Sequence, residues 1–154
     1  MALILAFDTS TKGCSAALFD QDQCLVQTEA IEEGFVHAER LHLLIESLFD
    51  QTDREFSALD AIAIGAGPGS YTGLRIGISA AKGYAFALEK PLIAIDSLAV
   101  MSESINTQLK TDQPEKIGIF SAIDARRQEV YARVQNGVGA LVMPSQALVL
   151  EEFA

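Results

Sequence analysis

The sequence predicts an α/β fold in which a group of antiparallel strands precedes strands that alternate with helices. Two observations support this prediction. Three apolar runs joined by short polar connections lie within residues 2–30, and two later apolar runs are each followed by a helical repeat. Short connections are typical of antiparallel neighbours, whereas a strand, a helix and a second strand in succession are typical of parallel ones.

The predicted order is strand, strand, strand, helix, strand, helix, strand, helix. The strands are expected at Ala2–Phe7, Cys14–Phe19, Cys24–Ala30, Ala61–Ile64 and Leu92–Ile95. The helices are expected at His37–Asp50, Tyr71–Leu88 and Ser97–Leu109, with Ser97 as the cap of the last. This βββαβαβα order is that of the ribonuclease H-like (actin-like ATPase) fold, which actin, sugar kinases and the Hsp70 ATPase share.

A polar, proline-containing segment, Thr111–Glu115, is the predicted boundary between two parts of the chain. Beyond it the pattern predicts two strands and a hairpin turn, at Lys116–Ile123, Glu129–Gln135 and Asn136-Gly137. We therefore expect residues 1–110 to form an N-terminal lobe. Residues 111–154 are expected to begin a second, similar lobe that this sequence does not complete.

The composition is strongly acidic, with a formal net charge of −10. Such a surface repels a phosphate backbone, so we expect no unaided binding of tRNA or other nucleic acid. Basic residues gather only near the end of the chain, at Arg126, Arg127 and Arg133. Apolar runs are too short for a membrane span, and the N-terminus lacks the basic start of a signal peptide, which indicates a cytoplasmic protein.

The two cysteines, Cys14 and Cys24, lie on neighbouring predicted strands. With a turn centred on Gln21-Asp22, Cys24 lies opposite Phe19. Cys14 then lies opposite Glu29, which is too far from Cys24 for a disulfide. We expect two buried free thiols, as suits a reducing compartment.

A glycine-rich loop, Gly65–Ser70, follows the fourth predicted strand. Its glycines and proline fix a tight backbone path that other groups can approach closely. Ser70 stands where both a Walker loop and a dinucleotide-binding loop need their last glycine, and no lysine is near. We therefore interpret the loop as a structural strand-to-helix turn.

The helix that follows this loop is apolar over a wider arc than one sheet can cover. One of its sides consists of small residues and a tyrosine: Gly73, Gly77, Ala80, Tyr84 and Ala87. This side predicts the close approach of a partner helix. Leu43, which points away from the apolar face of the preceding helix, indicates the same outer contact. The alternative is that the helix is buried wholly within its own domain.

Asp8, Thr9 and Ser10 follow the first strand, where proteins of this fold carry an acid and hydroxyls that face a nucleotide phosphate. The alternative is a hairpin in which these side chains cap their own backbone. The only histidines, His37 and His42, lie about 140° apart around a helix, so they cannot form an i, i+4 metal pair. No serine, cysteine or threonine has a base placed by the sequence, so we expect neither catalytic residues nor a metal site.

Four segments are distinctive: LAFDTST at residues 5–11, HAERL at 37–41, GAGPGSYTGLRIGISAAKG at 65–83 and IDARRQEVYA at 123–132. Together they resemble the bacterial TsaB family of tRNA threonylcarbamoyladenosine biosynthesis proteins, over nearly the whole chain. The resemblance implies an actin-like fold with two similar lobes. It also implies a role in forming N6-threonylcarbamoyladenosine in tRNAs that read codons beginning with A.

The resemblance further implies a non-catalytic scaffold that forms a heterodimer with the catalytic subunit TsaD through the first two helices. The ATPase TsaE joins this pair, and ATP or ADP belongs only to the complex, so no intrinsic cofactor is expected. Alone, the protein is expected to form a homodimer through the same helices, and it reaches tRNA only through the complex. The catalytic relative carries an H-x-x-x-H metal motif after its fifth strand, whereas Asp96–Met101 here contains no histidine.

The implied partner-helix interface comprises His37, Arg40, Leu43, Gly73, Ile76, Gly77, Ala80 and Tyr84. A vestigial nucleotide-facing set comprises Asp8, Thr9, Ser10, Gly67 and Gly69. The alternative function is an enzyme of the same fold, either a small-molecule kinase or ATPase or a glycoprotease-like peptidase.

Overall fold

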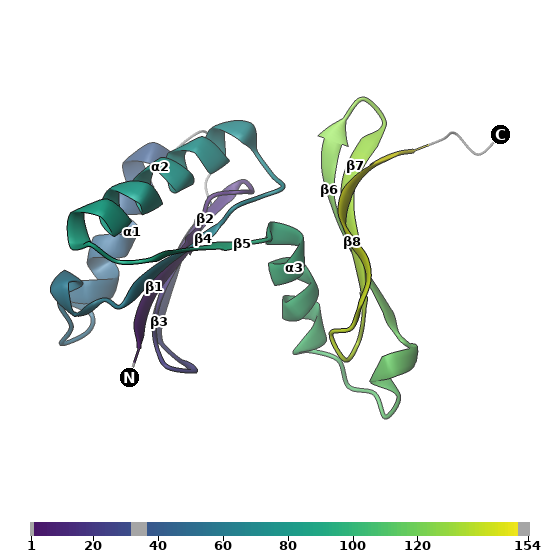
Figure 1. Ribbon diagram of the computed structural model, residues 1–154, viewed down its shortest axis with the longest axis horizontal. Helices are drawn as coiled ribbons and strands as arrows, with labels where there is room; N and C mark the ends of the chain where they lie inside the picture. Colours follow the sequence, from purple (N-terminus) through teal and green to yellow (C-terminus); the bar gives the residue numbers. More distant parts are fainter. Residues whose placement is uncertain (1, 32–36, 151–154) are drawn as a thin grey trace. The chain divides into compact units, whose positions relative to one another are not determined.

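A computed structural model describes residues 2–31 and 37–150 (Figure 1). The chain forms two compact units, Met1–Ile95 and Asp96–Ala154. The lobe boundary predicted after residue 110 therefore falls inside the second unit. The reason is that the third helix packs against the strands that follow it, as described below.

The first unit is built on a five-stranded mixed sheet with the order β3-β2-β1-β4-β5. Its strands are β1 (Leu3–Asp8), β2 (Gly13–Asp20), β3 (Gln23–Ile31), β4 (Ala61–Gly65) and β5 (Leu92–Ile95). The first three strands pair antiparallel, whereas β4 runs parallel to both β1 and β5. This topology confirms the predicted antiparallel group and the parallel crossovers.

Two helices, α1 (His37–Asp50) and α2 (Tyr71–Leu88), lie side by side on one face of this sheet (Figure 1). The first packs mainly on β2 and β3, and the second mainly on β4. Both helices have the bounds that the sequence predicts. A short 3₁₀ turn, η1 (Phe56–Ala58), precedes β4.

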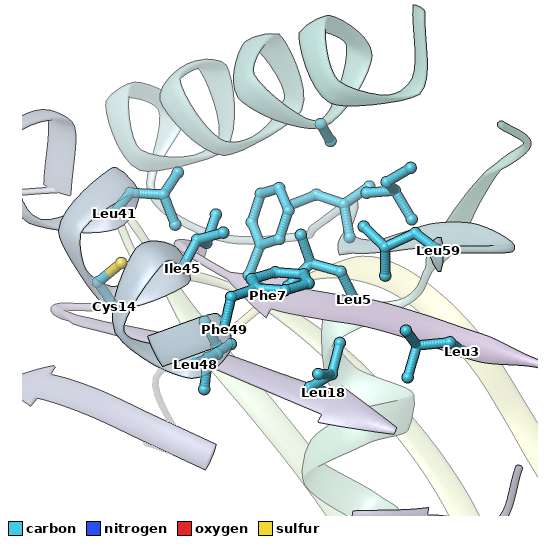
Figure 2. Packing of buried hydrophobic residues seen from close by; sticks show 14 residues of the cluster. Leu3, Leu5, Phe7, Cys14, Leu18, Leu41, Ile45, Leu48, Phe49 and Leu59 are labelled. Carbon is cyan, nitrogen blue, oxygen red and sulfur yellow. The ribbon is translucent and has the colours of Figure 1, made fainter. Parts of the chain in front are cut away.

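The core of the first unit lies between the sheet and these helices. Figure 2 shows Leu41 and Ile45 of α1 directed toward the cluster that contains Leu5 and Phe7 of β1. Leu5, Leu41 and Ile45 are fully buried. Burying a side chain of this size contributes roughly 1.5–3 kcal/mol, so the periodic leucines of α1 fix this helix on the sheet.

The second unit is a three-stranded antiparallel sheet with the order β6-β7-β8 and one helix against it. Its elements are α3 (Ser97–Asn106), η2 (Pro114–Lys116), β6 (Gly118–Arg126), β7 (Glu129–Asn136) and β8 (Leu141–Val149). Leu98 and Ser102 of α3 are buried. The Ser102 hydroxyl lies 2.9 Å from the Ser121 hydroxyl of β6, which ties the helix to this sheet.

The start of α3 differs from the prediction. Asp96, and not Ser97, is the cap, because its carboxylate accepts a hydrogen bond from the Ala99 N–H at 2.9 Å. Ser97 is the first helical residue and is buried. The helix also ends at Asn106, three residues before the predicted end.

The cysteines follow the prediction only in part. Cys24 lies opposite Phe19 as predicted, but Cys14 lies opposite Ala30 and not Glu29, because a bulge at Leu18/Phe19 shifts the register. Both thiols are free, and Cys14 is buried. Cys24 is exposed, so the prediction of two buried thiols is wrong. Its strand, β3, is an edge strand of the sheet.

Two hairpins of the second unit turn in different ways. Between β7 and β8, Gly139 takes the left-handed conformation with φ of 80°, and Asn136 Oδ1 accepts hydrogen bonds from the Val138 and Ala140 N–H groups. Between β6 and β7, three residues without glycine take positive φ: Arg126, Arg127 and Gln128. Such a residue costs on the order of 1 kcal/mol or more.

Candidate functional site

The structure brings together the two loops from which a nucleotide-facing set was predicted. Because β1 and β4 are parallel neighbours, their carboxyl ends lie at the same edge of the sheet. The Ser70 N–H donates to the Ser10 carbonyl oxygen at 2.7 Å. A Cβ added to Gly69 would overlap that same carbonyl oxygen. The loops are therefore in direct contact, with no side chain between them.

Asp8 organises the turn after β1. One oxygen of its carboxylate, Oδ1, accepts hydrogen bonds from the Ser10 N–H at 2.7 Å and from the Ser10 hydroxyl at 2.6 Å. The second oxygen, Oδ2, occupies the place that a Cβ at Gly65 would take. Asp8 and Ser10 thus make the local backbone contacts of the capping alternative.

Thr9 points inward and joins the first loop to α2. It is fully buried, and its hydroxyl donates to the Gly73 carbonyl oxygen at 2.7 Å. An added Cβ at Gly73 would overlap the Thr9 carbonyl oxygen, and one at Gly77 would overlap the Thr9 hydroxyl. Glycine is required at both positions because Thr9 lies against the helix backbone.

This contact corrects one prediction. Gly73 and Gly77 do not form an outward side for a partner helix, since both are buried against Thr9. The alternative, burial within the same domain, holds for this side of α2. Gly73 and Gly77 are therefore removed from the predicted interface, which otherwise stays a prediction.

The glycine-rich loop has the structural role predicted for it. Ser70 is the N-cap of α2, and its hydroxyl oxygen accepts a hydrogen bond from the Gly73 N–H at 3.2 Å. Gly67 has φ of 101°, which a side chain rarely adopts. Gly67 and Gly69 thus serve the path of the loop. Nucleotide contact by this set stays a prediction.

The opposite side of the helix pair is the outer helix face, which we define by Arg40 and Leu43 of α1 and by Gly83 and Phe86 of α2. Leu43 is 56% exposed and Phe86 is 88% exposed. A Cβ added to Gly83 would meet no atom within 4 Å. Arg40 is exposed as well. The outer helix face therefore presents two apolar side chains and one basic side chain, with open space at Gly83.

The remaining predicted interface residues are placed differently. Three of them, Ile76, Ala80 and Tyr84, are half-buried and pack against the core. His37 is the first residue of α1, and its side chain lies outside the described part of the chain. Gly83 and Phe86 are not among the interface residues predicted from the sequence. Phe86 could have been found from the sequence. It lies seven residues, or about two helical turns, after Ser79 and therefore on the polar side of α2, where an apolar side chain has no partner inside the domain.

An aromatic cluster fixes α1 to α2 beneath the outer helix face. The Tyr84 hydroxyl lies 2.9 Å from His42 Nδ1, and the Tyr84 ring stacks with that of Phe56 at a centroid distance of 5.9 Å. Burial, with a smaller contribution from Glu46, raises the pKa of Tyr84 above its ordinary value. These side-chain contacts join the two helices.

Residues 2–31 and 37–150 contain no candidate metal site. No three His, Cys, Asp or Glu side chains gather there in a group that could hold a metal ion. Asp96, at the start of the segment 96–101 that contains no histidine, caps α3. None of the helices in this part of the chain is long and apolar enough to cross a membrane.

Comparison with known proteins agrees with this architecture. Residues 34–143 match the family described as TsaD, tRNA N6-adenosine threonylcarbamoyltransferase. The chain is 35% identical over 128 residues to the tRNA threonylcarbamoyladenosine biosynthesis protein TsaB of Haemophilus influenzae, covering 83% of this chain and 51% of that protein. It is 32% identical over 154 residues to the protein of the same name from Bacillus subtilis, covering 97% and 63%.

A solved structure, YeaZ from Pseudomonas aeruginosa, superposes with a TM-score of 0.84 at 36% identity, covering 100% of this chain and 70% of that one. A second structure, of an uncharacterized protein with similarity to peptidase YEAZ from Pseudomonas aeruginosa, has a TM-score of 0.85 and 36% identity, covering 100% and 69%. The fold is thus of the actin-like, ribonuclease H-like class. Within that class the chain belongs to the TsaD family, on its TsaB branch.

The chain spans 51–63% of the length of the curated relatives from Haemophilus influenzae and Bacillus subtilis. Their names place them in the biosynthesis of threonylcarbamoyladenosine on tRNA.

Proposed function

We propose that this chain takes part in forming N6-threonylcarbamoyladenosine on tRNA as a cytoplasmic, non-catalytic partner of the transferase TsaD. The relatives' names support the pathway. The observation that carries the partner role is the outer helix face, where Leu43 and Phe86 are exposed and a Cβ at Gly83 would meet open space. Exposed apolar side chains on one face are typical of a protein interface.

The geometry of this face suits a helix of the partner. Helix axes that pack closely lie roughly 8–10 Å apart, and a glycine at the contact allows the nearer part of that range. Gly83 provides this space, while Leu43 and Phe86 supply apolar side chains beside it. Glu39 and Glu46 on α1 are exposed nearby, so the partner is expected to offer basic side chains as well. Without TsaD, the same face would pair two copies of this chain.

The absence of a catalytic role is supported by the loops. The Ser10 and Thr9 hydroxyls donate to groups of the same chain, so they are engaged in holding the turn and α2. In this proposal, ATP or ADP, TsaE and tRNA meet this chain only within the complex. The alternative is an enzyme of the same fold, which one solved relative suggests because its name refers to a peptidase. Steady ATP hydrolysis or peptide cleavage by the purified chain would favour that alternative.

Co-purification with TsaD tests the proposal. Leu43→Glu and Gly83→Leu should each abolish capture of TsaD, because one places a charge in the contact and the other fills the space at Gly83. The matched control is Leu141→Glu on β8, because Leu141 is 52% exposed and Leu43 is 56% exposed. This control should capture TsaD like the unchanged chain. The proposal is wrong if both helix variants, folded by circular dichroism, still capture TsaD to the same extent.

A further inference from the structure

The β6–β7 hairpin turns through residues that suit its backbone poorly. Arg126, Arg127 and Gln128 have φ of 68°, 54° and 62°. Hairpin turns with positive φ are formed most easily by Asn-Gly, and other side chains lose stability there. The needs of the fold therefore do not explain these three residues.

The neighbouring hairpin shows that the second unit can use the favourable residues. Between β7 and β8, a glycine takes the positive φ at Gly139, and Asn136 accepts two hydrogen bonds within the turn. Two hairpins of one sheet thus differ in whether the turn residues stabilise the turn. Residues that oppose local stability are frequently kept for a function.

Among residues 2–31 and 37–150, neither arginine of this hairpin has an ion-pair partner. Both side chains are exposed. Asp124, the nearest acid along β6, uses Oδ1 to accept a hydrogen bond from the Arg126 backbone N–H at 2.7 Å. Each guanidinium group can bind a carboxylate or a phosphate through two parallel hydrogen bonds.

Exposed apolar side chains lie beside this tip. The Leu150 N–H donates to the Gln128 carbonyl oxygen at 2.6 Å, and Val149 lies opposite Glu129 in the register of β7 and β8. Val149 is 68% exposed and Leu150 is 53% exposed. Arginine next to exposed apolar groups is typical of a protein contact.

A nucleic-acid backbone fits this surface less well. Phosphate chains need several cations in a row, whereas Asp124 and Glu129 flank the two arginines here. The formal charge of −10 also opposes the approach of a polyanion. A short acidic segment with apolar side chains matches both the charges and the apolar neighbours.

We propose that the tip of the β6–β7 hairpin, with the end of β8, binds an acidic and apolar segment of a partner protein. Carboxylates of the segment pair with Arg126 and Arg127, and its apolar side chains contact Val149 and Leu150. This surface belongs to the second unit and does not depend on the outer helix face. Its test is therefore independent of the capture of TsaD.

The probe is a fluorescein-labelled twelve-residue peptide of repeated Glu-Glu-Leu, titrated with the whole chain and followed by anisotropy. Arg126→Gln/Arg127→Gln should weaken binding about tenfold, because two charge-assisted contacts are lost. Lys110→Gln/Lys116→Gln makes the same change of charge elsewhere in the unit and should leave binding unchanged. A Gln-Gln-Leu peptide should not bind.

A second variant separates this role from a structural one. Arg127→Asn/Gln128→Gly should raise the unfolding temperature, since it supplies the favoured turn, and should still weaken peptide binding.

Glu151 and Glu152 follow Leu150 in the sequence, so the titration is repeated with Glu151→Gln/Glu152→Gln to remove an internal competitor. Peptide binding by either chain supports the proposal. The proposal is overturned if neither chain binds the peptide, or if both hairpin variants bind it as well as the unchanged chain does. It is also overturned if a parallel titration shows that Arg126 and Arg127 are needed to bind a twelve-nucleotide RNA but not to bind the peptide.

Discussion

The two sides of α2 carry the same residue with opposite consequences. On the inner side, Gly73 and Gly77 lie against Thr9, where no Cβ has room. On the outer helix face, a Cβ at Gly83 would meet no atom within 4 Å. The difference shows that a helical glycine is explained by what lies against it. The inner glycines allow a loop to dock, whereas the outer one leaves an open surface.

The largest effect is expected on the inner side. Gly77→Ala places a Cβ over the Thr9 hydroxyl and 3.1 Å from Ile64 Cδ1. Overpacking should destabilise the chain by roughly 2–3 kcal/mol, even after a gain of about 1 kcal/mol in helix propensity. Urea unfolding followed by circular dichroism measures this loss. A variant as stable as the unchanged chain would contradict the close contact with Thr9.

A smaller effect is expected from the other partner of this contact. Thr9→Ala removes the hydroxyl that donates to the Gly73 carbonyl oxygen, at a cost of about 1 kcal/mol. The same change makes room for a Cβ at position 77. The double variant Thr9→Ala/Gly77→Ala should therefore lose less stability than the sum of the single losses, which a double-mutant cycle measures. Strict additivity would show that the two sites are not in contact.

The buried Cys14 and the exposed Cys24 are expected to differ in how they respond to pH. Burial, with a smaller contribution from Asp8, raises the pKa of Cys14 from 9.0 to about 11. A raised pKa means that the neutral thiol stabilises the fold below pH 9, and that this contribution is lost as the pH rises from about 9 to 11. Thermal unfolding should show a smaller decrease over this range for Cys14→Ala than for the unchanged chain.

Alkylation provides the matched control for this prediction. At pH 8, iodoacetamide should modify the exposed Cys24 and leave Cys14 unmodified, because the reactive species is the thiolate. Cys24→Ala should then abolish labelling of the native chain. Rapid labelling of Cys14 in this variant would contradict its burial.

The smallest effect, with the opposite sign, is expected on the outer side. Gly83→Ala fills open space in a helix interior and should stabilise the isolated chain by about 0.5–1 kcal/mol. The measurement is the same urea titration as for Gly77→Ala, so the two variants compare one substitution on two sides of one helix. A loss of stability at position 83 would show that this side is already covered.

The order and type of the elements could be predicted because their hydrophobic repeats are local. Both α1 and α2 have their predicted bounds, since periodic leucines and the residues at Ser70 and Pro91 mark them. Which side of α2 faces the core could not be predicted in this way. It is decided by Thr9, which lies 64 residues before Gly73 in the sequence. No repeat within the helix contains that information.

The candidate sites show the same limit. The resemblance grouped Asp8, Thr9 and Ser10 with Gly67 and Gly69, and parallel pairing of β1 and β4 brings these two loops to one edge of the sheet. The sequence did not reveal that the Thr9 hydroxyl faces inward. The turn at Arg127 was equally hidden, since positive φ at such a residue has no local signal.

The contact between Thr9 and α2 also has a consequence for the rate of folding. The hairpin of β1 and β2 joins strands that are adjacent in the sequence, whereas the contact between Thr9 and Gly73 closes a separation of 64 residues. We therefore expect this contact to form late, after the rate-limiting step of folding. Substitutions at Gly77 are expected to accelerate unfolding strongly and to change the refolding rate little. In a chain with this order of events, the inner glycines determine how long the native state lasts once it has formed.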